Sequence, residues 1–282
     1  MHAIEQEIKD FIRYWTFPYL RPRRFHAFGV GGPKSGTHSL ASVFRRYREF
    51  HEPEHERHMQ IIMARADGVI SDSRAQDQVR RLDRRKWLEF NSSYLNYFLL
   101  DLLLDEYPQA KFVLTIRDCY SWLDSVFNQL LGRTHEEFET QFHRWYLESM
   151  SPGSHEAGDR ALAERGFWPL DAWLRVWTQH NTRVMAMVPS DQLLIVRTQD
   201  IRRDIPRMAE FLGIPPDTLD AGRSHEYKAA QKFGLLSEVD EEYLDTCVEA
   251  HCKELMERFF PEIRRFSDIH GYRRQDAEVQ AS

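Results

Sequence analysis

The spacing of apolar residues changes several times along this chain of 282 residues. From Ile4 to Trp15, apolar side chains recur every three or four positions, which predicts an amphipathic helix. Residues 25–30, FHAFGV, form instead a continuous apolar run that leads into glycines and predicts a buried strand. Helical spacing resumes from Leu40 to Tyr47. The first fifty residues therefore predict a helix, a strand and a second helix.

The same alternation continues through the rest of the chain. Short apolar runs predict strands in WLEFN (87–91), KFVLTIR (111–117) and QLLIVR (192–197). Helical spacing predicts helices over 94–107, 120–131, 138–146, 168–188, 205–213 and 238–260. Strands that alternate with helices indicate a parallel sheet covered on both faces. We expect an α/β fold of three layers around a central, mostly parallel sheet, with ligands bound beyond the carboxyl ends of the strands.

Charge and cysteine content narrow the class of protein. The net charge of −6 lacks the basic excess of a typical nucleic-acid-binding protein. No apolar run approaches the roughly 18 residues of a membrane span, and the charged start MHAIEQEIKDFIRYW has no signal-peptide pattern. Cys119, Cys247 and Cys252 are too few for a disulfide framework, so we expect structural cysteines in a reducing, cytoplasmic compartment. No repeat or long linker divides the chain, which predicts one domain over residues 1–282.

The first predicted strand is followed by GVGGPKSGTHSL and a predicted helix. A glycine-rich turn before a helix binds anions, because unpaired N–H groups and the helix dipole point at one place. The nucleotide-binding P-loop has the pattern G-x-x-x-x-G-K-[ST]. Gly31 and Gly36 have this separation, but Thr37 and His38 occupy the last two positions, and Lys34 lies inside the loop. A glycine pair alone would fit a structural turn; the enclosed lysine favours an anion site.

Two later strands are predicted to end in cations. P-loop enzymes hold Mg²⁺ with a loop hydroxyl group and with an aspartate at the end of a neighbouring strand. Here the predicted strands end in Arg117 and Arg197. Asp118 follows Arg117 and offers a carboxylate for magnesium. An alternative is therefore a small-molecule kinase that uses ATP and magnesium. The arginines favour a site that holds anions with protein charges and without a divalent metal ion.

At this loop the chain resembles the sulfotransferases that use 3′-phosphoadenosine 5′-phosphosulfate (PAPS), which have a P-loop NTPase-like sulfotransferase fold. Their loop P-K-S-G-T-[TS] is matched by Pro33, Lys34, Ser35, Gly36 and Thr37, with His38 in place of a second hydroxyl residue and Ser39 nearby. The resemblance implies that the loop cradles the 5′-phosphosulfate of the donor. It also implies that the lysine neutralises the leaving phosphate.

The second signature of that family is an arginine at the end of a later strand, with a serine eight residues on, which together grip the 3′-phosphate. Arg117 and Ser125 have this interval. Thr198 stands where a tyrosine often occurs, which leaves the adenine contacts open. A late basic segment completes the 3′-phosphate site in relatives, and Lys228 is our candidate for it.

The resemblance covers most of residues 25–215, which we expect to form the donor-binding core. An aromatic-rich helical insertion is expected at about 132–190, and a C-terminal helical segment at about 236–265. The aromatic residues of the insertion either belong to the core or wall an apolar acceptor pocket; they are Phe138, Phe142, Trp145, Tyr146, Trp168, Trp173 and Trp177.

The segment FHEPEH matches the zinc motif H-E-x-x-H, in which two histidines share one helix face. Pro53 disfavours that helix. The segment follows the helix of the glycine-rich loop, where a second strand is expected to begin. It would therefore lie at the same sheet edge as Lys34. His55 and His58 are expected on the surface of the next helix.

Sulfuryl transfer also needs a base that takes the proton of the acceptor. Several sulfotransferase branches place a catalytic glutamate just after the loop helix. Glu52 is the first candidate for this base, with Glu54 and His51 behind it, and a solvated loop charge is the alternative reading of Glu52.

The sequence thus predicts in-line, metal-free transfer of a sulfuryl group from PAPS, with PAP as product. The acceptor would be a hydroxyl or amine of a small-molecule, lipid-like or glycan compound. Besides the kinase, a non-catalytic nucleotide-binding protein that keeps the loop but has lost the base stays an alternative. A homodimer is possible.

Overall fold

The computed structural model describes residues 2–132, 137–148, 153–223 and 232–269. The chain divides into two compact units. Unit 1 comprises Met1–Ile116 with Arg183–Tyr227, and unit 2 comprises Arg117–Thr182 with Lys228–Ser282. Each unit therefore combines one earlier and one later segment of the chain. Whether the two units act as one domain stays a prediction.

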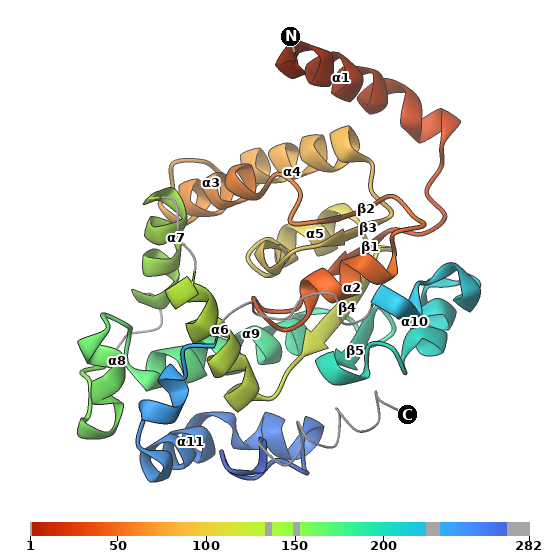
Figure 1. Cartoon of the computed structure of the whole chain (residues 1–282). Coiled ribbons are helices and arrows are strands. Elements are labelled where there is room, and N and C mark those ends of the chain that lie inside the picture. The colour runs from red at the N-terminus through yellow and green to blue at the C-terminus, as the bar shows by residue number, and fades with distance from the viewer. Residues whose placement is uncertain (1, 133–136, 149–152, 224–231, 270–282) are drawn as a thin grey trace. The chain divides into compact units, whose positions relative to one another are not determined.

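Unit 1 is built on a five-stranded sheet with the order β2-β3-β1-β4-β5 (Figure 1). The strands are β1 (Ala27–Gly29), β2 (Glu49–His51), β3 (Phe90–Ser92), β4 (Lys111–Ile116) and β5 (Leu193–Arg197). All four pairings that the structure describes are parallel. The predicted α/β fold class is confirmed. Because the strands are parallel, the residues that follow them meet at one edge of the sheet.

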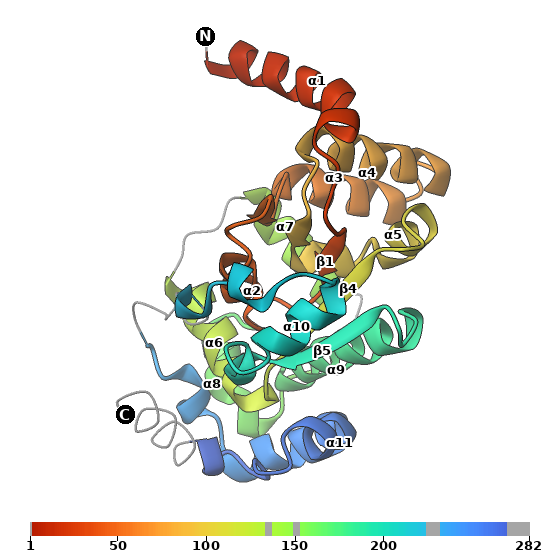
Figure 2. The ribbon, with the colours of Figure 1, turned by 90° about the vertical axis from the view of Figure 1, so that its right-hand side faces the viewer.

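Helices cover both faces of this sheet (Figure 2). The helices of unit 1 are α1 (His2–Leu20), which packs on α4, and α2 (Thr37–Val43), α3 (His55–Ala66), α4 (Asp72–Lys86), α5 (Leu100–Glu106) and α10 (Ile205–Leu212). On one face, α2 and α10 share a hydrophobic cluster with β1, β3, β4 and β5. On the other face, Phe28 of β1 lines a small cavity together with Val79 and Leu82 of α4 and Leu103 of α5.

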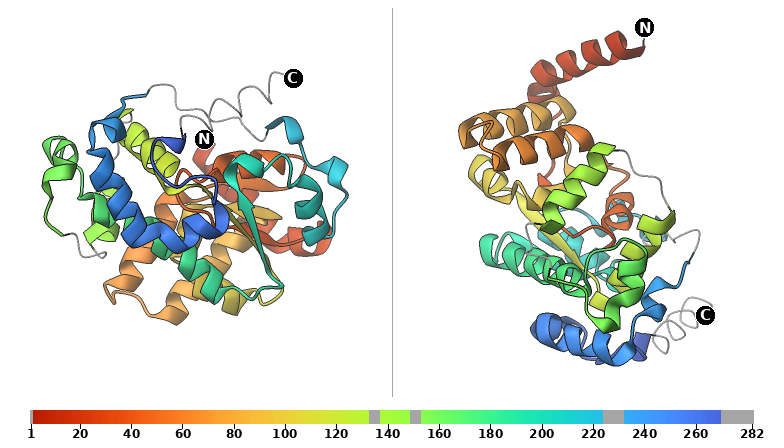
Figure 3. Two further views of the ribbon diagram at one scale, coloured as in Figure 1. Left: turned by 90° about the horizontal axis from the view of Figure 1, so that it is seen from below. Right: turned by 90° about the vertical axis from the view of Figure 1, so that its left-hand side faces the viewer.

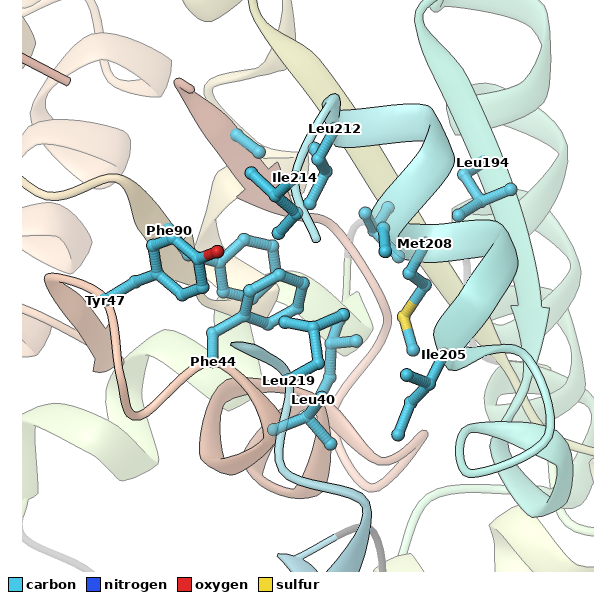
Figure 4. Packing of buried hydrophobic residues seen from close by; sticks show 14 of the residues in the cluster. Leu40, Phe44, Tyr47, Phe90, Leu194, Ile205, Met208, Leu212, Ile214 and Leu219 are labelled. Carbon is cyan, nitrogen blue, oxygen red and sulfur yellow. The ribbon is translucent and has the colours of Figure 1, made fainter. Parts of the chain in front are cut away.

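The cluster under α2 and α10 is dominated by aromatic and branched side chains (Figure 4). Phe44 stacks on Phe90 of β3 with ring centroids 4.1 Å apart and an interplanar angle of 19°. Met208 of α10 and Leu40 of α2 are completely buried in the same cluster. Burying an aromatic ring or a leucine stabilises the folded state by about 1.5–3 kcal/mol each. This packing fixes α2, and with it the end of the glycine-rich loop, on the sheet.

An ionic network joins the amino ends of three strands. Glu89, directly before β3, is fully buried. Its carboxylate accepts hydrogen bonds from the backbone N, Nε and Nη2 of Arg24, ahead of β1, and from the backbone N of Arg48, ahead of β2, at 2.9–3.0 Å. Burial alone would raise the pKa of Glu89, but the hydrogen bonds from Arg24 and Arg48 lower it to about 2. The network ties β1, β2 and β3 together at the edge opposite to the glycine-rich loop.

Unit 2 contains α6 (Cys119–Gly132), α7 (Glu137–Glu148), α8 (Arg160–Glu164), the first part of α9 (Leu170–Met187) and α11 (Glu241–Phe259). α11 packs against α6 and α9 (Figure 3). Four of the seven aromatic residues named above are buried, namely Phe142, Tyr146, Trp173 and Trp177. These four belong to the core of unit 2. All three cysteines are free thiols and buried, as expected for structural residues.

The predicted helices and strands are present, with ends that differ by a few residues. The predicted helix at 94–107 begins with a 3₁₀ turn, Tyr94–Tyr97, before α5. The sequence did not indicate α4, because Ala75, Val79 and Leu82 are its only buried residues among many charges. No helix in the described part of the chain has both the length and the hydropathy needed to span a bilayer.

Candidate functional site

The glycine-rich loop lies at the carboxyl end of the central strand β1 and leads into α2. Val30 extends β1 by donating its N–H to the carbonyl O of Val113 at 2.9 Å. Lys34 and Gly36 then take positive φ angles of 62° and 93°. Positive φ is uncommon for a residue with a side chain, so the surroundings must hold Lys34 in this conformation. The chain therefore turns sharply around Lys34, as the glycine spacing predicted.

Hydroxyl groups brace the loop from the neighbouring strands. Ser35 Oγ donates to the carbonyl O of Gly32 at 2.7 Å and lies 3.2 Å from Thr115 Oγ1 of β4. Thr198 Oγ1, directly after β5, lies 2.5 Å from the carbonyl O of Ser35 and 3.1 Å from that of Ile116. The Ser35 hydroxyl thus supports the loop itself. Thr198, to which no role was assigned from the sequence, connects the loop to the ends of two strands.

Two glycines of the loop, Gly31 and Gly36, stand where a side chain would collide. A Cβ at Gly31 would lie 2.0 Å from Thr115 Oγ1 and 2.6 Å from Ser35 Oγ. A Cβ at Gly36 would lie 2.8 Å from Thr198 Cγ2, in addition to the strain of its φ angle. The close approach of the loop to β4 and to Thr198 therefore requires glycine at these two positions.

The FHEPEH segment leaves β2 in a tight turn. His51 is the last residue of β2, and α3 begins at His55. Between them, Glu52 and Glu54 have positive φ angles of 54° and 53°, and the N–H of Glu52 donates to the carbonyl O of Ser92 at 2.8 Å. The segment is not helical, which confirms that it is not the helical form of H-E-x-x-H. Within residues that the structure describes, no group of three His, Cys, Asp or Glu is arranged to hold a metal ion.

The two glutamates of this turn have different surroundings. Glu54 lies 2.6 Å from Arg85 Nη2, 3.0 Å from Lys86 Nζ and 3.6 Å from Arg57 Nε. Burial opposes ionisation of Glu54, but the hydrogen bond from Lys86 and the three positive charges lower its pKa. Glu54 therefore ties α3 to α4, and a carboxylate held in this way is a poor base.

The Glu52 carboxylate lies beside histidines instead. Its oxygens are 3.8 Å from His51 Nε2 and 3.5 Å from His55 Nδ1, and 28% of its side chain is exposed. His51 Nε2 is also 3.1 Å from Thr37 Oγ1, at the start of α2. The structure therefore brings Glu52, His51 and Thr37 together at one sheet edge. Of the three residues considered as the base, Glu52 and His51 are next to the loop, and Glu54 is engaged elsewhere.

The charge state of His51 follows from its neighbours. Burial lowers the pKa of His51 to about 4, helped by the positive charges of His38, His55 and Lys34. The rings of His38 and His51 have centroids 5.1 Å apart. His51 is therefore neutral at physiological pH. The positive charge of Lys34 is the smallest of these influences on the pKa of His51.

The expectation that His58 lies on the surface of α3 is wrong. His58 is buried, and its Nδ1 lies 2.8 Å from the carbonyl O of Pro53. The reason is that His58 shares the inner face of α3 with Met59, Ile61 and Ile62, and a hydrogen bond to Pro53 compensates the buried ring nitrogen. His55 is half-buried beside Glu52.

Arg117 and Ser125 belong to unit 2. Arg117 follows directly after β4, and its carbonyl O accepts a hydrogen bond from Trp177 Nε1 at 2.9 Å. Ser125 is half-buried on α6, eight residues further on. Asp118 is buried and accepts the N–H of Ser121 at 2.8 Å. The Asp118 carboxylate therefore stabilises the first turn of α6. This role argues against Asp118 as a magnesium ligand.

The remaining predicted site residues lie around the loop, except one. Pro33 and His38 are half-buried, and Ser39 is buried on α2. The backbone of Thr37 is anchored to β3, because Ser92 Oγ donates to its carbonyl O at 2.9 Å. Lys228 lies outside the described residues. The structure thus groups the loop residues with the end of β2.

A family profile described as "Sulfotransferase domain" matches residues 27–230, which include the glycine-rich loop, the end of β2, Arg117 and Ser125. Ava biosynthesis cluster protein M of Aspergillus versicolor is 29% identical over 117 residues, which are 34% of this chain and 40% of that relative.

Two solved structures are also similar to this chain. A sulfotransferase from Alicyclobacillus acidocaldarius has a TM-score of 0.47 and 18% identity, over 86% of this chain and 99% of that one. The sulfotransferase domain of the Synechococcus PCC 7002 olefin synthase has a TM-score of 0.40 and 16% identity, over 95% of this chain and 98% of that one.

Proposed function

Since this chain belongs to the sulfotransferase family, we propose that it transfers a sulfuryl group from PAPS to a hydroxyl or amine, with PAP as the second product. The observation that carries the proposal is the conformation of the loop. Lys34 is held in a left-handed turn between Gly31 and Gly36. A phosphosulfate bound at the carboxyl end of β1 would need a positive charge at this place, and Lys34 would supply it.

The proposed reaction is an in-line displacement at sulfur. The acceptor oxygen or nitrogen forms a bond to sulfur, the bond from sulfur to the bridging oxygen breaks, and its electron pair stays on the 5′-phosphate of PAP. Lys34 neutralises that developing charge, which typically contributes about 10²–10³ in rate. The proton of the acceptor passes to Glu52, a contribution of about 10²–10⁴.

His51 and Thr37 have a supporting part in this proposal. His51 is neutral, so it does not compete with Lys34 as a cation, and its Nε2 lies within hydrogen-bond distance of the Thr37 hydroxyl. A neutral imidazole therefore orients Thr37 at the start of α2. Pro33, Ser35, Gly36, His38 and Ser39 complete the loop that we propose for the 5′-phosphosulfate.

For the 3′-phosphate we propose Arg117 and Ser125, with Lys228 as a further cation. No metal ion is required in this scheme, because charges of the protein balance the phosphates. Asp118 supports that view, since its carboxylate is engaged at the first turn of α6. The acceptor is proposed to be a small molecule, lipid-like compound or glycan, and the place of action the cytoplasm.

Thermal unfolding with PAP, with ADP and with ATP and magnesium tests the proposal. We expect PAP to raise the melting temperature in the presence of EDTA, because a ligand at about 100 times its Kd adds roughly 2.7 kcal/mol of stability. Lys34→Ala should reduce the shift, whereas Lys253→Ala, on the exposed side of α11, should not. A shift only with ATP and magnesium indicates the kinase instead, and ADP serves to test the need for the 3′-phosphate.

Transfer is measured with ³⁵S-labelled PAPS, using 2-naphthol and n-decanol as probe hydroxyls. Glu52→Gln should keep the PAP-dependent thermal shift but lose transfer by about 10²–10⁴. Glu54→Gln should lower the rate of transfer only as far as the weaker contact between α3 and α4 destabilises the fold. PAP binding without transfer to any probe, in a chain with Glu52 intact, would favour the non-catalytic nucleotide-binding protein.

A further inference from the structure

The two oxygens of the Glu52 carboxylate have different neighbours. Oε1 is 3.8 Å from His51 Nε2, and Oε2 is 3.5 Å from His55 Nδ1. His51 Nε2 is in turn 3.1 Å from Thr37 Oγ1, where the glycine-rich loop enters α2. Oε1 is therefore the oxygen on the side of the loop, and Oε2 is the oxygen on the side of α3.

The backbone that carries Glu52 is fixed on several sides. Pro53 is buried, and its carbonyl O lies 2.8 Å from Nδ1 of His58 on α3. Glu54 lies 2.6 Å from Arg85 Nη2 of α4. The positive φ angles of Glu52 and Glu54 persist only because such contacts determine the conformation of the turn. The Cα of Glu52 therefore has a fixed place, and what remains to be restricted is rotation of its side chain.

His55 is the first residue of α3, and its ring is held from a second element as well. The Nδ1 atom is buried, whereas 25% of the whole side chain is exposed. The ring packs on the buried ring of Tyr94, shortly after β3, with centroids 5.8 Å apart and an interplanar angle of 57°. Ser93 fixes this segment, because its Oγ accepts the N–H of Leu95 at 3.2 Å. The direction of Nδ1 is thus set by α3 and by the segment after β3.

The surroundings of Nδ1 indicate where the His55 ring carries a proton. An ionised carboxylate only accepts hydrogen bonds, so an imidazole nitrogen beside it favours the protonated form of that nitrogen, in a neutral ring as in a charged one. The distance of 3.5 Å to Oε2 is long for a hydrogen bond, as is common for catalytic groups before the substrate binds. One ring N–H restrains the carboxylate, whereas three cations engage that of Glu54.

We propose that His55 is the positioning residue of the base: its Nδ1–H holds Oε2 of Glu52, so that Oε1 faces the loop and takes the proton of the acceptor. The inference rests on the proposed sulfuryl transfer and adds a residue to it. The proton moves from the acceptor to Oε1 as the acceptor bonds to sulfur, and the Nδ1 proton stays on His55. Without His55 the carboxylate rotates, and a misplacement of about 1 Å costs about 100-fold in rate.

Two substitutions separate the N–H of His55 from its ring. His55→Phe keeps an aromatic ring against Tyr94 but has no N–H, whereas His55→Asn has no ring but places an amide N–H near the position of Nδ1. With ³⁵S-labelled PAPS and the probe hydroxyls, His55→Phe should lower kcat about 30–100-fold at an unchanged KM for PAPS, and His55→Asn should stay within about fivefold of the unaltered chain. Both should keep the PAP-dependent thermal shift. Glu56→Gln, exposed in the same turn of α3, is the control.

The state of the His55 ring is also measurable without an acceptor. In a PAP-bound chain with ¹⁵N in its histidine rings, the His55 signals are those that His55→Asn lacks. At about pH 8, where an imidazole of ordinary pKa is neutral, they should show the proton on Nδ1. Glu52→Ala should abolish that preference, because no carboxylate then faces Nδ1.

Equal losses of kcat in His55→Phe and His55→Asn would overturn the proposal, because the ring would then serve packing alone. Full activity of His55→Phe would overturn it too, as would a neutral His55 ring with its proton on Nε2. Each of these results leaves sulfuryl transfer standing. Failure of the proposed function is distinct: the unaltered chain then neither binds PAP nor transfers the label, and the part of His55 falls with it.

Discussion

Replacing Glu89 by glutamine should destabilise the fold strongly at neutral pH, and progressively less as the pH falls from 4.5 towards 2. Glutamine keeps the size of the side chain but has no charge and one oxygen fewer. It would leave Arg24 and Arg48 without the carboxylate that now accepts hydrogen bonds at 2.9–3.0 Å from both. Because the side chain of Glu89 is fully buried, water cannot take the place of that carboxylate.

The expected loss follows from the pKa of Glu89. Its folded-state pKa of about 2 lies below the usual 4.5. At about 1.4 kcal/mol per pKa unit, the ionised form stabilises the fold by about 3 kcal/mol. The folded-state pKa is depressed, so this stability is fully present above pH 4.5 and is lost as the pH falls towards 2. The glutamine variant lacks it at every pH.

Urea unfolding of both proteins at pH 7.0, 5.0, 4.0 and 3.5 measures the effect. The difference in unfolding free energy should be about 3 kcal/mol at pH 7.0 and should shrink by about 1 kcal/mol at pH 3.5. Glu210→Gln, at an exposed position of α10, controls for a general effect of removing one charge. A difference below about 1 kcal/mol at pH 7.0, or one that does not change with pH, would refute the argument.

Three further predictions concern the loop and its neighbours. Lys34→Ala should lower the rate of ³⁵S transfer about 10²–10³-fold at saturating PAPS while the melting temperature of the ligand-free protein stays unchanged; an unchanged rate would contradict the role of Lys34. Gly31→Ala should destabilise the fold by about 1–3 kcal/mol in urea unfolding and abolish the PAP-dependent thermal shift, because its Cβ would lie 2.0 Å from Thr115 Oγ1. Since burial and nearby positive charges lower the pKa of His51 to about 4, His51 stays neutral and kcat/KM should stay within about twofold between pH 8 and 5.5. An inflection near pH 6.5 that is lost in His51→Asn would count against a neutral His51.

The sequence predicted those parts of the fold that depend on local patterns. The strand KFVLTIR and the glycine-rich loop are continuous in sequence, and each has a spacing that only a few conformations satisfy. The turn at FHEPEH was also predictable, because Pro53 disfavours a helix whatever surrounds it. These local signals were sufficient to place Lys34 and Glu52 at one edge of the sheet.

Other features depend on residues that are far apart in sequence. Glu89 meets Arg24 and Arg48 only because β1, β2 and β3 are neighbours in the sheet, and no spacing in the sequence indicates this. The same holds for Thr198, which reaches the loop across 163 residues. His58 was misplaced because a histidine among charges suggests a surface position, whereas the carbonyl of Pro53 satisfies its ring nitrogen inside the fold.

The central claim is that protein cations alone hold a donor with phosphates at both its 3′ and 5′ positions. Isothermal titration of the full chain with PAP and with ADP, both in EDTA, measures this most directly. We expect PAP to bind at least about 30-fold more tightly than ADP, since a charged hydrogen-bonded contact to the 3′-phosphate is worth about 2 kcal/mol or more. Arg117→Ala should remove that preference. Equal affinities for the two nucleotides, or binding that appears only when magnesium is added, would contradict the account.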